Sequence, residues 1–384
     1  MKLRRVGQDS DIAEFYQESQ KQESEKLGIE YEKDDDSGEE NWPYDVKSIR
    51  IDQKMISVFQ VEYWISSGRL NLKPEYQRYV VWDFQRKCAL VESLLLRIPI
   101  PAFYIEENKD GSKSVIDGMQ RLTTIHEFLN NEFPLQKMQY LKNCEGLYFR
   151  DLNIKFRSAI EDTQLAVNLL DERCPQMVKF DVFRRVNTGG VPLNPQEIRN
   201  IMMTGRVRAF LREMSGSAQF QKATLGKVKD TRMGAQELCL RFLAIYLNYD
   251  WKLKEFTSFC GLLGTMDYMV VQLNEVSDEK LEELKERFFK VMEECALILG
   301  KQSFCKPGSR TMNKALFTGW AVTLCNLSIS DGRLKECRGQ LFQAYMERLS
   351  HDEAFYDSIS VSTGTRKNIQ KSIESIREVV EGIL

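Results

Sequence analysis

The chain has 384 residues, of which 42% are hydrophobic, and a formal net charge of −2 at pH 7. This length can bury a full core and predicts two domains. No apolar run approaches the roughly 18 residues that span a bilayer, and the charged N-terminus lacks the apolar stretch of a signal peptide, so we expect a cytoplasmic protein without a membrane segment. The nine cysteines stand singly and only two histidines are present, which argues against a zinc site, a disulfide framework and a histidine-dependent hydrolase.

The first 45 residues are strongly acidic. Residues 1–45 hold 6 Lys and Arg against 14 Asp and Glu, a local charge of −8. The remaining residues carry 48 basic and 42 acidic side chains, a charge of +6. We therefore predict a mobile acidic arm over residues 1–45, ahead of a mildly basic folded body. One hypothesis is that the arm lies over a basic cleft when no ligand is bound, and the alternative is a solvated tail.

Regular elements are expected from about residue 46 onward. Ile49 and Ile51 alternate with polar residues as in a strand, and residues 58–67 have helical spacing that ends at Gly68. Asp83 is a good N-cap for a helix that reaches residue 97, where the two prolines of Ile98-Pro-Ile-Pro101 prevent its continuation. Four polar side chains gather near this helix start: Gln77, Arg78, Gln85 and Arg86.

A compact strand, turn and helix signal follows at residues 113–125. Residues 102–106 and 113–116 form a plausible β-hairpin around the turn signal of residues 108–112. Gly118 then breaks the second strand, and from Met119 the apolar residues recur at the spacing of one helix face. On this helix we expect His126 to be a partly buried structural residue.

The polar residues of this turn suggest a ligand site. Gln120 and Arg121 fall in the first helical turn, where free N–H groups and the helix dipole favour an anion. Arg121 supplies a planar fork suited to phosphate, and Asp117 a carboxylate that could hold a metal ion or a hydroxyl. The alternative is structural: Asp117 only caps the helix and Arg121 pairs with it.

The later sequence changes from mixed to helical character. After a loop-rich stretch over residues 133–151, we expect a strand at 164–170 and a helix at 176–186. Asn194, Pro195 and Glu197 then form an explicit helix start with a capping box. Beyond residue 205 the strand signals almost vanish, which predicts an all-helical second domain over residues 206–384. The expected helices span residues 206–214, 235–247, 253–273, 279–299, 314–327, 333–349 and 366–384.

Several short sequence motifs follow one another along the chain, and together they resemble those of one protein family. The chain resembles the bacterial domain-of-unknown-function 262 family, which is similar to ParB and sulfiredoxin in fold. That family forms the N-terminal part of GmrSD-type modification-dependent restriction enzymes and is also carried by SspE defence proteins. The helical remainder, with Asn313-Lys-Ala-Leu-Phe317, looks like the C-terminal region of stand-alone members. The motifs that carry the resemblance are Pro74-Glu-Tyr-Gln-Arg78 with Val81-Trp82, Leu94-Leu-Leu-Arg-Ile-Pro-Ile-Pro101, Asp117-Gly-Met-Gln-Arg-Leu-Thr-Thr124, and Phe183-Arg-Arg-Val-Asn-Thr-Gly-Gly190 with Glu197-Ile-Arg199.

The resemblance implies a ParB/sulfiredoxin-like α+β domain over residues 46–205 that binds a nucleoside triphosphate with Mg²⁺. The Asp-Gly-Gln-Gln-Arg motif of the relatives is tied to NTP binding or hydrolysis, and we expect Asp117, Gln120 and Arg121 to be the catalytic residues here. We expect Asp117 or Glu197 to hold Mg²⁺ through water. The nucleotide-binding candidates are Gln77, Arg78, Arg86, Gly118, Arg184, Asn187, Thr188, Gly189, Glu197 and Arg199.

Two departures from the family pattern limit what it implies. Met119 replaces the commoner first glutamine of the motif, so the resemblance supports NTP binding more strongly than NTP hydrolysis. The helical region contains His351 alone, so it cannot supply a His-Asn-His nuclease. The expected function is an NTP-binding, DNA-associated protein of a bacterial anti-phage or restriction system. The alternatives are a ParB-like DNA nuclease and a non-catalytic recognition subunit whose helical domain binds a protein partner.

Overall fold

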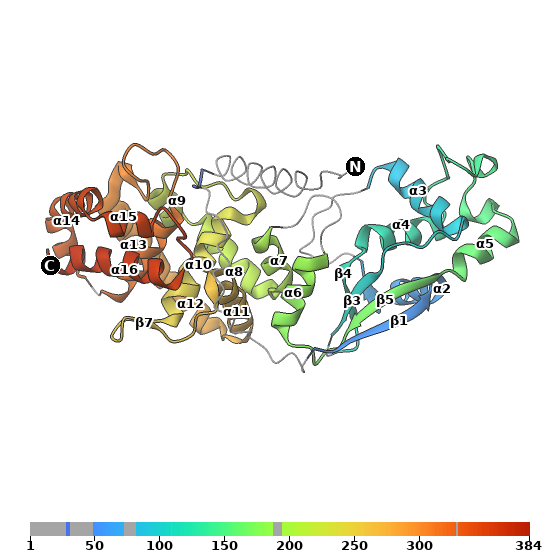
Figure 1. Cartoon of the computed structure of the whole chain (residues 1–384), viewed down its shortest axis with the longest axis horizontal. Helices are drawn as coiled ribbons and strands as arrows, with labels where there is room; N and C mark the ends of the chain where they lie inside the picture. Colours follow the sequence, from blue (N-terminus) through green and yellow to red (C-terminus); the bar gives the residue numbers. More distant parts are fainter. Residues whose placement is uncertain (1–27, 31–48, 73–81, 109, 187–193, 328) are drawn as a thin grey trace, which may run out of the picture. The chain divides into compact units, whose positions relative to one another are not determined.

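The computed structural model describes residues 28–30, 49–72, 82–108, 110–186, 194–327 and 329–384, which fall into two compact units (Figure 1). The described residues from 49 to 186 form the first, here called the α+β unit. Residues 28–30 and 194–384 form the second, here called the helical unit. The α+β character of the first and the dominance of helices in the second agree with the predicted fold class.

The α+β unit is built on a mixed five-stranded sheet with the order β1-β5-β3-β4-β2. β1 pairs with β5 and β3 with β4 in antiparallel register, whereas β3–β5 and β2–β4 are parallel. The predicted hairpin of β3 and β4 and the predicted strand β5 are confirmed. The strands are β1 (Ile51–Ser57), β2 (Leu70–Asn71), β3 (Phe103–Glu107), β4 (Lys113–Asp117) and β5 (Gln164–Leu170).

Side chains of alternate strand residues and one face of several helices form the core of this unit. On β3, Phe103 and Ile105 enter the core, so Tyr104 and Glu106, which alternate with them, point to the opposite face of the sheet. α4 packs against α2 and α3, and α6 packs against β4. The helices are α2 (Val58–Ser66), α3 (Phe84–Leu95), α4 (Met119–Leu129), α5 (Ile154–Glu161) and α6 (Gln176–Val186).

Local capping explains where these helices begin. The Asp83 carboxylate accepts the backbone N–H of Arg86, as predicted for the start of α3. Asn153 caps α5 in the same way, although α5 itself is not among the predicted elements. Two 3-10 turns, Lys142–Cys144 and Phe149–Asp151, lie in the loop-rich stretch before α5. Glu92 of α3 is buried and accepts the backbone N–H groups of residues 139, 140 and 141, which holds this loop on the helix.

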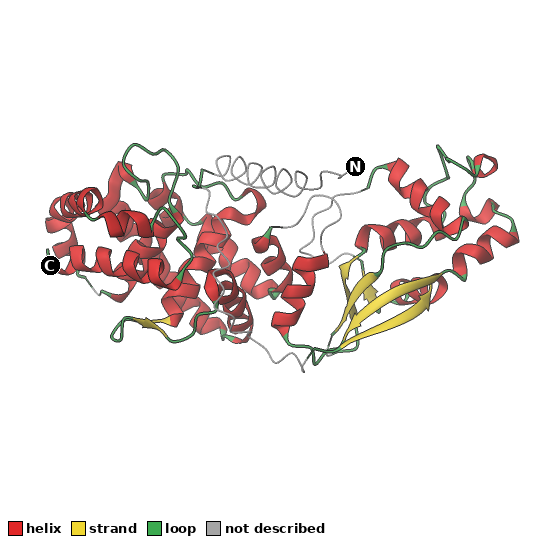
Figure 2. Ribbon diagram, viewed as in Figure 1, coloured by secondary structure: helices red, strands yellow, loops and turns green. Residues whose placement is uncertain are grey.

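The second domain was predicted to be all-helical, but the helical unit also contains two short strands. A short hairpin of β6 (Tyr249–Asp250) and β7 (Glu255–Phe256) interrupts the helices (Figure 2). The predicted helix 253–273 begins only at Gly261 because the Asp250 carboxylate accepts the backbone N–H groups of residues 252 and 253 and closes the hairpin turn. The aromatic rings of Tyr249 and Phe256 meet across the two strands.

The remaining helices follow the predicted ranges closely, with α9 and α15 as additions. α13 is buried along almost its whole length and packs against α10, α12 and α16, so it forms the centre of the unit. Two 3-10 turns, Thr231–Met233 and Gly300–Gln302, join helices. The α-helices are α7 (Pro195–Met202), α8 (Gly205–Gly216), α9 (Ala218–Thr224), α10 (Gly234–Asn248), α11 (Gly261–Glu275), α12 (Asp278–Leu299), α13 (Lys314–Asn326), α14 (Asp331–His351), α15 (Glu353–Ser358) and α16 (Arg366–Glu381).

Candidate functional site

The turn between β4 and α4 has the strand, turn and helix structure that the sequence predicts. Ile116 and Leu122 are both buried. Gly118 joins the two elements with φ of +100°, a backbone conformation that favours glycine. A Cβ atom at this position would lie 2.3 Å from a ring carbon of Phe103. Glycine is therefore required at this turn by both conformation and space.

Arg121 is the residue whose surroundings differ most from expectation. As a candidate phosphate contact in the first helical turn it was expected to be accessible to a ligand, but it is only 9% exposed. Its guanidinium donates hydrogen bonds to the backbone oxygens of Pro101 and Ala102, the latter at 3.2 Å, and its central carbon lies 4.4 Å from the centroid of the Phe103 ring. The expectation is wrong because the chain entering β3 closes over the first turn of α4 and supplies these acceptors.

The fourth partner of Arg121 is Asp117, the last residue of β4. Nη2 of Arg121 lies 2.9 Å from Oδ2 of Asp117, which is the pair foreseen by the structural alternative. Burial raises the pKa of the Asp117 carboxyl, and the Arg121 charge and the Gly118 N–H partly offset this increase. Burial likewise lowers the pKa of Arg121, with Asp117 acting in the opposite direction.

The Asp117 carboxylate is oriented without being enclosed. Arg121 and the Gly118 N–H hold it, while 33% of its side chain remains exposed. A carboxylate fixed in this way can accept a hydrogen bond from a hydroxyl or from water on a divalent cation. Chemically, Asp117 is thus the open group of the motif and Arg121 is the group that positions it.

Gln120 connects the motif to a second segment of the resemblance. Its Oε1 accepts the backbone N–H of Trp82 at 3.1 Å, across 38 residues of sequence. Arg121 similarly reaches Pro101, the end of a third segment. Three of the segments that carry the family resemblance therefore meet at the first turn of α4. Gln77 and Arg78, which precede Trp82, lie outside the described residues.

The other predicted nucleotide-binding residues of this unit are on α3 and α6. Arg86 lies in the first turn of α3, is exposed, and has its Nε 3.6 Å from Asp83. Arg184 lies in the last turn of α6, half-buried, with Nη1 3.8 Å from Asp181. Asn187, Thr188 and Gly189 follow α6 and lie outside the described residues.

Sequence reasoning missed one buried charge that positions α6. Lys179 is 3% exposed, and its ammonium group pairs with the Glu106 carboxylate on β3. The pair lies on the sheet face opposite the main core, because Glu106 alternates with the core residue Ile105. A lysine at a helix position flanked by buried apolar residues was the only signal in the sequence.

Glu197 and Arg199 lie in the helical unit and are engaged within it. Glu197 forms the predicted capping box with Asn194 and also accepts from Arg232, with Nη2 to Oε2 at 2.8 Å. Arg199 is 1% exposed and its Nε lies 2.7 Å from Asp267. These partners stand 35 and 68 residues further along the chain, so no local pattern indicated them.

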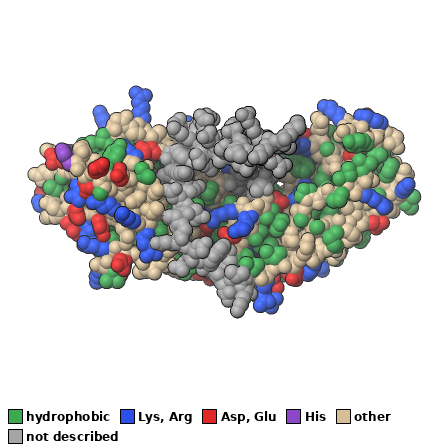
Figure 3. All heavy atoms as spheres, viewed as in Figure 1, with side chains coloured by type: hydrophobic (Ala, Val, Ile, Leu, Met, Phe, Trp, Pro, Cys, Tyr) green, Lys and Arg blue, Asp and Glu red, His purple; other side chains and the backbone are tan. Residues whose placement is uncertain are grey.

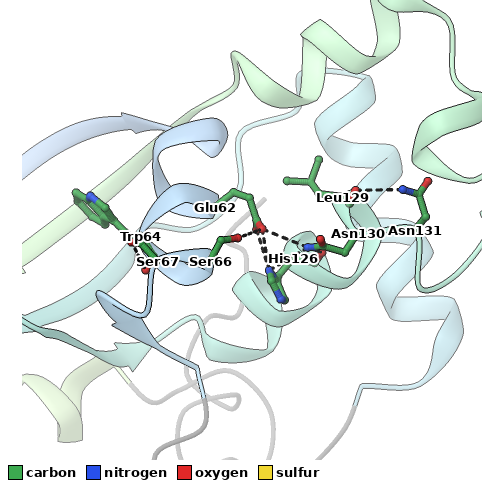
Figure 4. A network of polar contacts seen from close by, with 8 residues as sticks. All are labelled: Glu62, Trp64, Ser66, Ser67, His126, Leu129, Asn130 and Asn131. Carbon is green, nitrogen blue, oxygen red and sulfur yellow. Dashed lines mark hydrogen bonds and ion pairs between the residues drawn. The ribbon is translucent and has the colours of Figure 1, made fainter.

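His126 forms part of a polar network between α2 and α4 (Figure 4). Its Nδ1 lies 2.9 Å from both carboxylate oxygens of Glu62, and the Glu62 carboxylate also accepts from Ser66 at 2.7 Å and from Asn130 at 3.2 Å. Figure 4 shows these side chains converging on the Glu62 carboxylate. The network bridges two helices of the core, which agrees with the structural role expected for His126.

Comparison with known families identifies the segment that holds this site. Residues 61–203 match the family model of the GmrSD restriction endonuclease N-terminal domain. The chain therefore contains a GmrSD N-terminal-like domain, and the match includes the Asp117 to Arg121 turn. No curated protein matches the chain. Within the described residues, no helix has the length and hydropathy needed to cross a membrane.

Proposed function

We propose that this protein binds a nucleoside triphosphate through its GmrSD N-terminal-like domain and acts in a bacterial restriction or anti-phage defence system. The observation that carries the proposal is the Asp117 carboxylate, held by Arg121 and Gly118 at the start of α4 within the matched segment. We also assign the unit a ParB/sulfiredoxin-like fold. Its mixed sheet, with the motif at the junction of β4 and α4, supports that assignment.

The start of α4 provides the donors for phosphate. Backbone N–H groups in the first turn of a helix have no partner within the helix, and the helix dipole adds partial positive charge there. Gly118 is itself buried against the Phe103 ring, so in this proposal the ligand meets the backbone at Met119 and Gln120, which are partly exposed. In this proposal Arg86 adds positive charge from α3, and the segments with Gln77, Arg78, Asn187, Thr188 and Gly189 complete the site.

The structure changes the part proposed for Arg121 and for the acidic residues. Because Arg121 is buried against Phe103 and two carbonyl groups, we propose it as a positioning residue for Asp117. Mg²⁺ enters with the triphosphate, and the exposed edge of Asp117 fits a cation held through water. Glu197 fits this role poorly, because Arg232 and the capping box already engage its buried carboxylate.

Calorimetric titration of Asp117→Asn with nucleotide tests the proposal. The variant keeps the shape of the side chain but loses its charge, so we expect Mg²⁺-dependent affinity to fall by roughly ten- to a hundred-fold, which corresponds to about 1.4–2.8 kcal/mol. Asp110→Asn, in the exposed β3–β4 turn, is the matched control and should bind as the wild type does. Wild-type affinity in Asp117→Asn, with Mg²⁺ present and a normal thermal melt, would refute the proposed site.

The description of the matched family, a restriction endonuclease domain, supports association with DNA as the second part of the proposal. On the face of the helical unit in view in Figure 3, basic and acidic side chains are intermingled. Contact with duplex DNA should therefore come from a local basic patch, with an affinity that falls steeply as salt rises. Binding to duplex DNA at 50 and 200 mM salt tests this, and equal affinity at both would argue against phosphate contacts.

A further inference from the structure

Three residues of the acidic N-terminal segment are bound within the helical unit. The Met312 N–H donates to the Gly28 carbonyl at 2.9 Å, and the Glu30 N–H donates to the Met312 carbonyl at 2.8 Å, which makes a parallel β-bridge between Ile29 and Met312. Ile29 is 1% exposed. The segment therefore binds through one β-bridge, which uses its backbone, and through a buried apolar side chain.

The backbone fit requires glycine at the first position. Gly28 has a φ of +76°, and a Cβ atom there would lie 2.1 Å from the carbonyl oxygen of Lys227. Since the obstacle is backbone, no change of side-chain rotamer could relieve the contact. The surface beneath Gly28 thus excludes every other residue at this position.

The third position is recognised through its charge. One carboxylate oxygen of Glu30 accepts from Nδ2 of Asn313 at 2.9 Å and lies 3.0 Å from Nζ of Lys306. Asn313 is 2% exposed and is held by two further hydrogen bonds, to the Ile359 carbonyl and from the Leu316 N–H at the start of α13. Lys306 also lies over the ring of Tyr356. Both donors thus also have contacts with the helical unit that do not involve Glu30.

We propose that the helical unit contains a peptide-binding groove, formed by Lys227, Lys306, Met312 and Asn313, that recognises a glycine–apolar–acidic tripeptide whose glycine has a positive φ. Gly28–Glu30 of the same chain is its resident ligand. The two backbone hydrogen bonds to Met312 provide affinity, and the buried apolar side chain and the carboxylate contact provide specificity, a division also found in strand addition. The groove also gives a role to Asn313, the first residue of the Asn313–Phe317 motif, which has no part in the proposed nucleotide site.

Hydrogen exchange on the full-length protein tests whether the groove holds this segment. The Met312 N–H is protected by the Gly28 carbonyl, so a peptide that contains Met312 reports on occupancy. We expect Glu30→Lys to speed exchange at Met312 at least tenfold, and the reciprocal pair Glu30→Lys with Lys306→Glu to restore most of the protection. Glu255→Lys, an equal charge change on exposed β7, is the matched control and should leave Met312 protected.

Binding in trans provides the second arm of the test. Ile29→Asp places a charge where the wild type buries an apolar side chain, and so should empty the groove of the full-length chain. A labelled peptide of residues 25–33 should then bind to this variant, and a peptide with lysine at the position of Glu30 should bind at least tenfold more weakly. Unchanged Met312 exchange in Glu30→Lys, or equal binding of the two peptides, would overturn the proposal.

Discussion

Replacement of Arg121 by alanine should destabilise the α+β unit even when no ligand is present. The substitution removes the guanidinium that joins Asp117 to the backbone of Pro101 and Ala102 and that stacks on Phe103. The pair with Asp117 and the two backbone contacts are separate contributions. Asp117 is one-third exposed, so water can replace part of what its carboxylate loses.

The size of the effect can be worked from these contacts. A hydrogen bond to a charged group contributes about 1.5–3 kcal/mol, and a partly buried cation–π contact adds about 0.5–2 kcal/mol. With allowance for the exposure of Asp117 and for rehydration of the carbonyl of Pro101, an exposed residue, we expect a loss of about 2–4 kcal/mol. In a unit of this size, each kcal/mol lowers Tm by about 2–4 °C, so the expected drop is roughly 5–15 °C.

Differential scanning calorimetry of the wild type, Arg121→Ala and Arg121→Lys would measure this loss. Lysine keeps the charge but not the planar fork, so it should recover only part of the stability. Arg86→Ala, which removes an exposed arginine from the same unit, is the matched control and should change the stability by less than about 0.5 kcal/mol. An unchanged Tm in Arg121→Ala, combined with a loss of nucleotide affinity, would show that Arg121 contacts ligand directly and would refute the structural argument.

Two further substitutions test other parts of the α+β unit. Gly118→Ala should cost about 2–5 kcal/mol, because the new Cβ meets the Phe103 ring in a backbone conformation that alanine rarely adopts; Gly146→Ala, at a similar φ with open space around it, should cost clearly less, and equal drops in Tm would contradict the steric argument. Burial raises the pKa of Glu92, but three backbone N–H donors together outweigh it and hold that pKa below the ordinary value of 4.5. The stability that Glu92 contributes is therefore present above pH 4.5 and is lost as pH falls through the lower pKa of the folded state. Thermal melts between pH 3 and 7 should show a smaller acid-induced loss of Tm in Glu92→Gln than in the wild type. Parallel curves of Tm against pH would show that these hydrogen bonds do not lower the pKa of the Glu92 carboxyl.

The parts of the fold that were predicted correctly are those set by residues close together in the sequence. The turn at Gly118 was predictable because a strand-like run, a glycine and a helical apolar spacing follow one another within thirteen residues. The capping box at Asn194 depends on contacts three residues apart, and it forms as predicted. The β6–β7 hairpin was missed because its residues continue an apolar spacing that also fits a helix, while the Asp250 carboxylate closes the turn.

The surroundings of the site residues depend on contacts that no local pattern contains. Arg121 was expected at the surface because helix first turns are usually solvated, yet residues 19 and 20 positions earlier cover it. Arg199 was a candidate ligand contact, but its carboxylate partner, Asp267 on α11, lies 68 residues further along the chain. Residue types with the right chemistry could thus be named from sequence, but whether each side chain faces solvent or another residue required the tertiary structure.

The bridge between Ile29 and Met312 also sets an order of events during synthesis. Glu30 and Asn313 are 283 residues apart, so at about 5–20 residues per second the ribosome makes the groove roughly 15–60 s after the tripeptide that fills it. The described strands and helices of the α+β unit are all synthesised within that interval. During this time Gly28–Glu30 has no groove to enter. A nascent chain released before Met312 would leave these residues unpaired and open to proteases, whereas in the finished chain their burial marks completion of the helical unit.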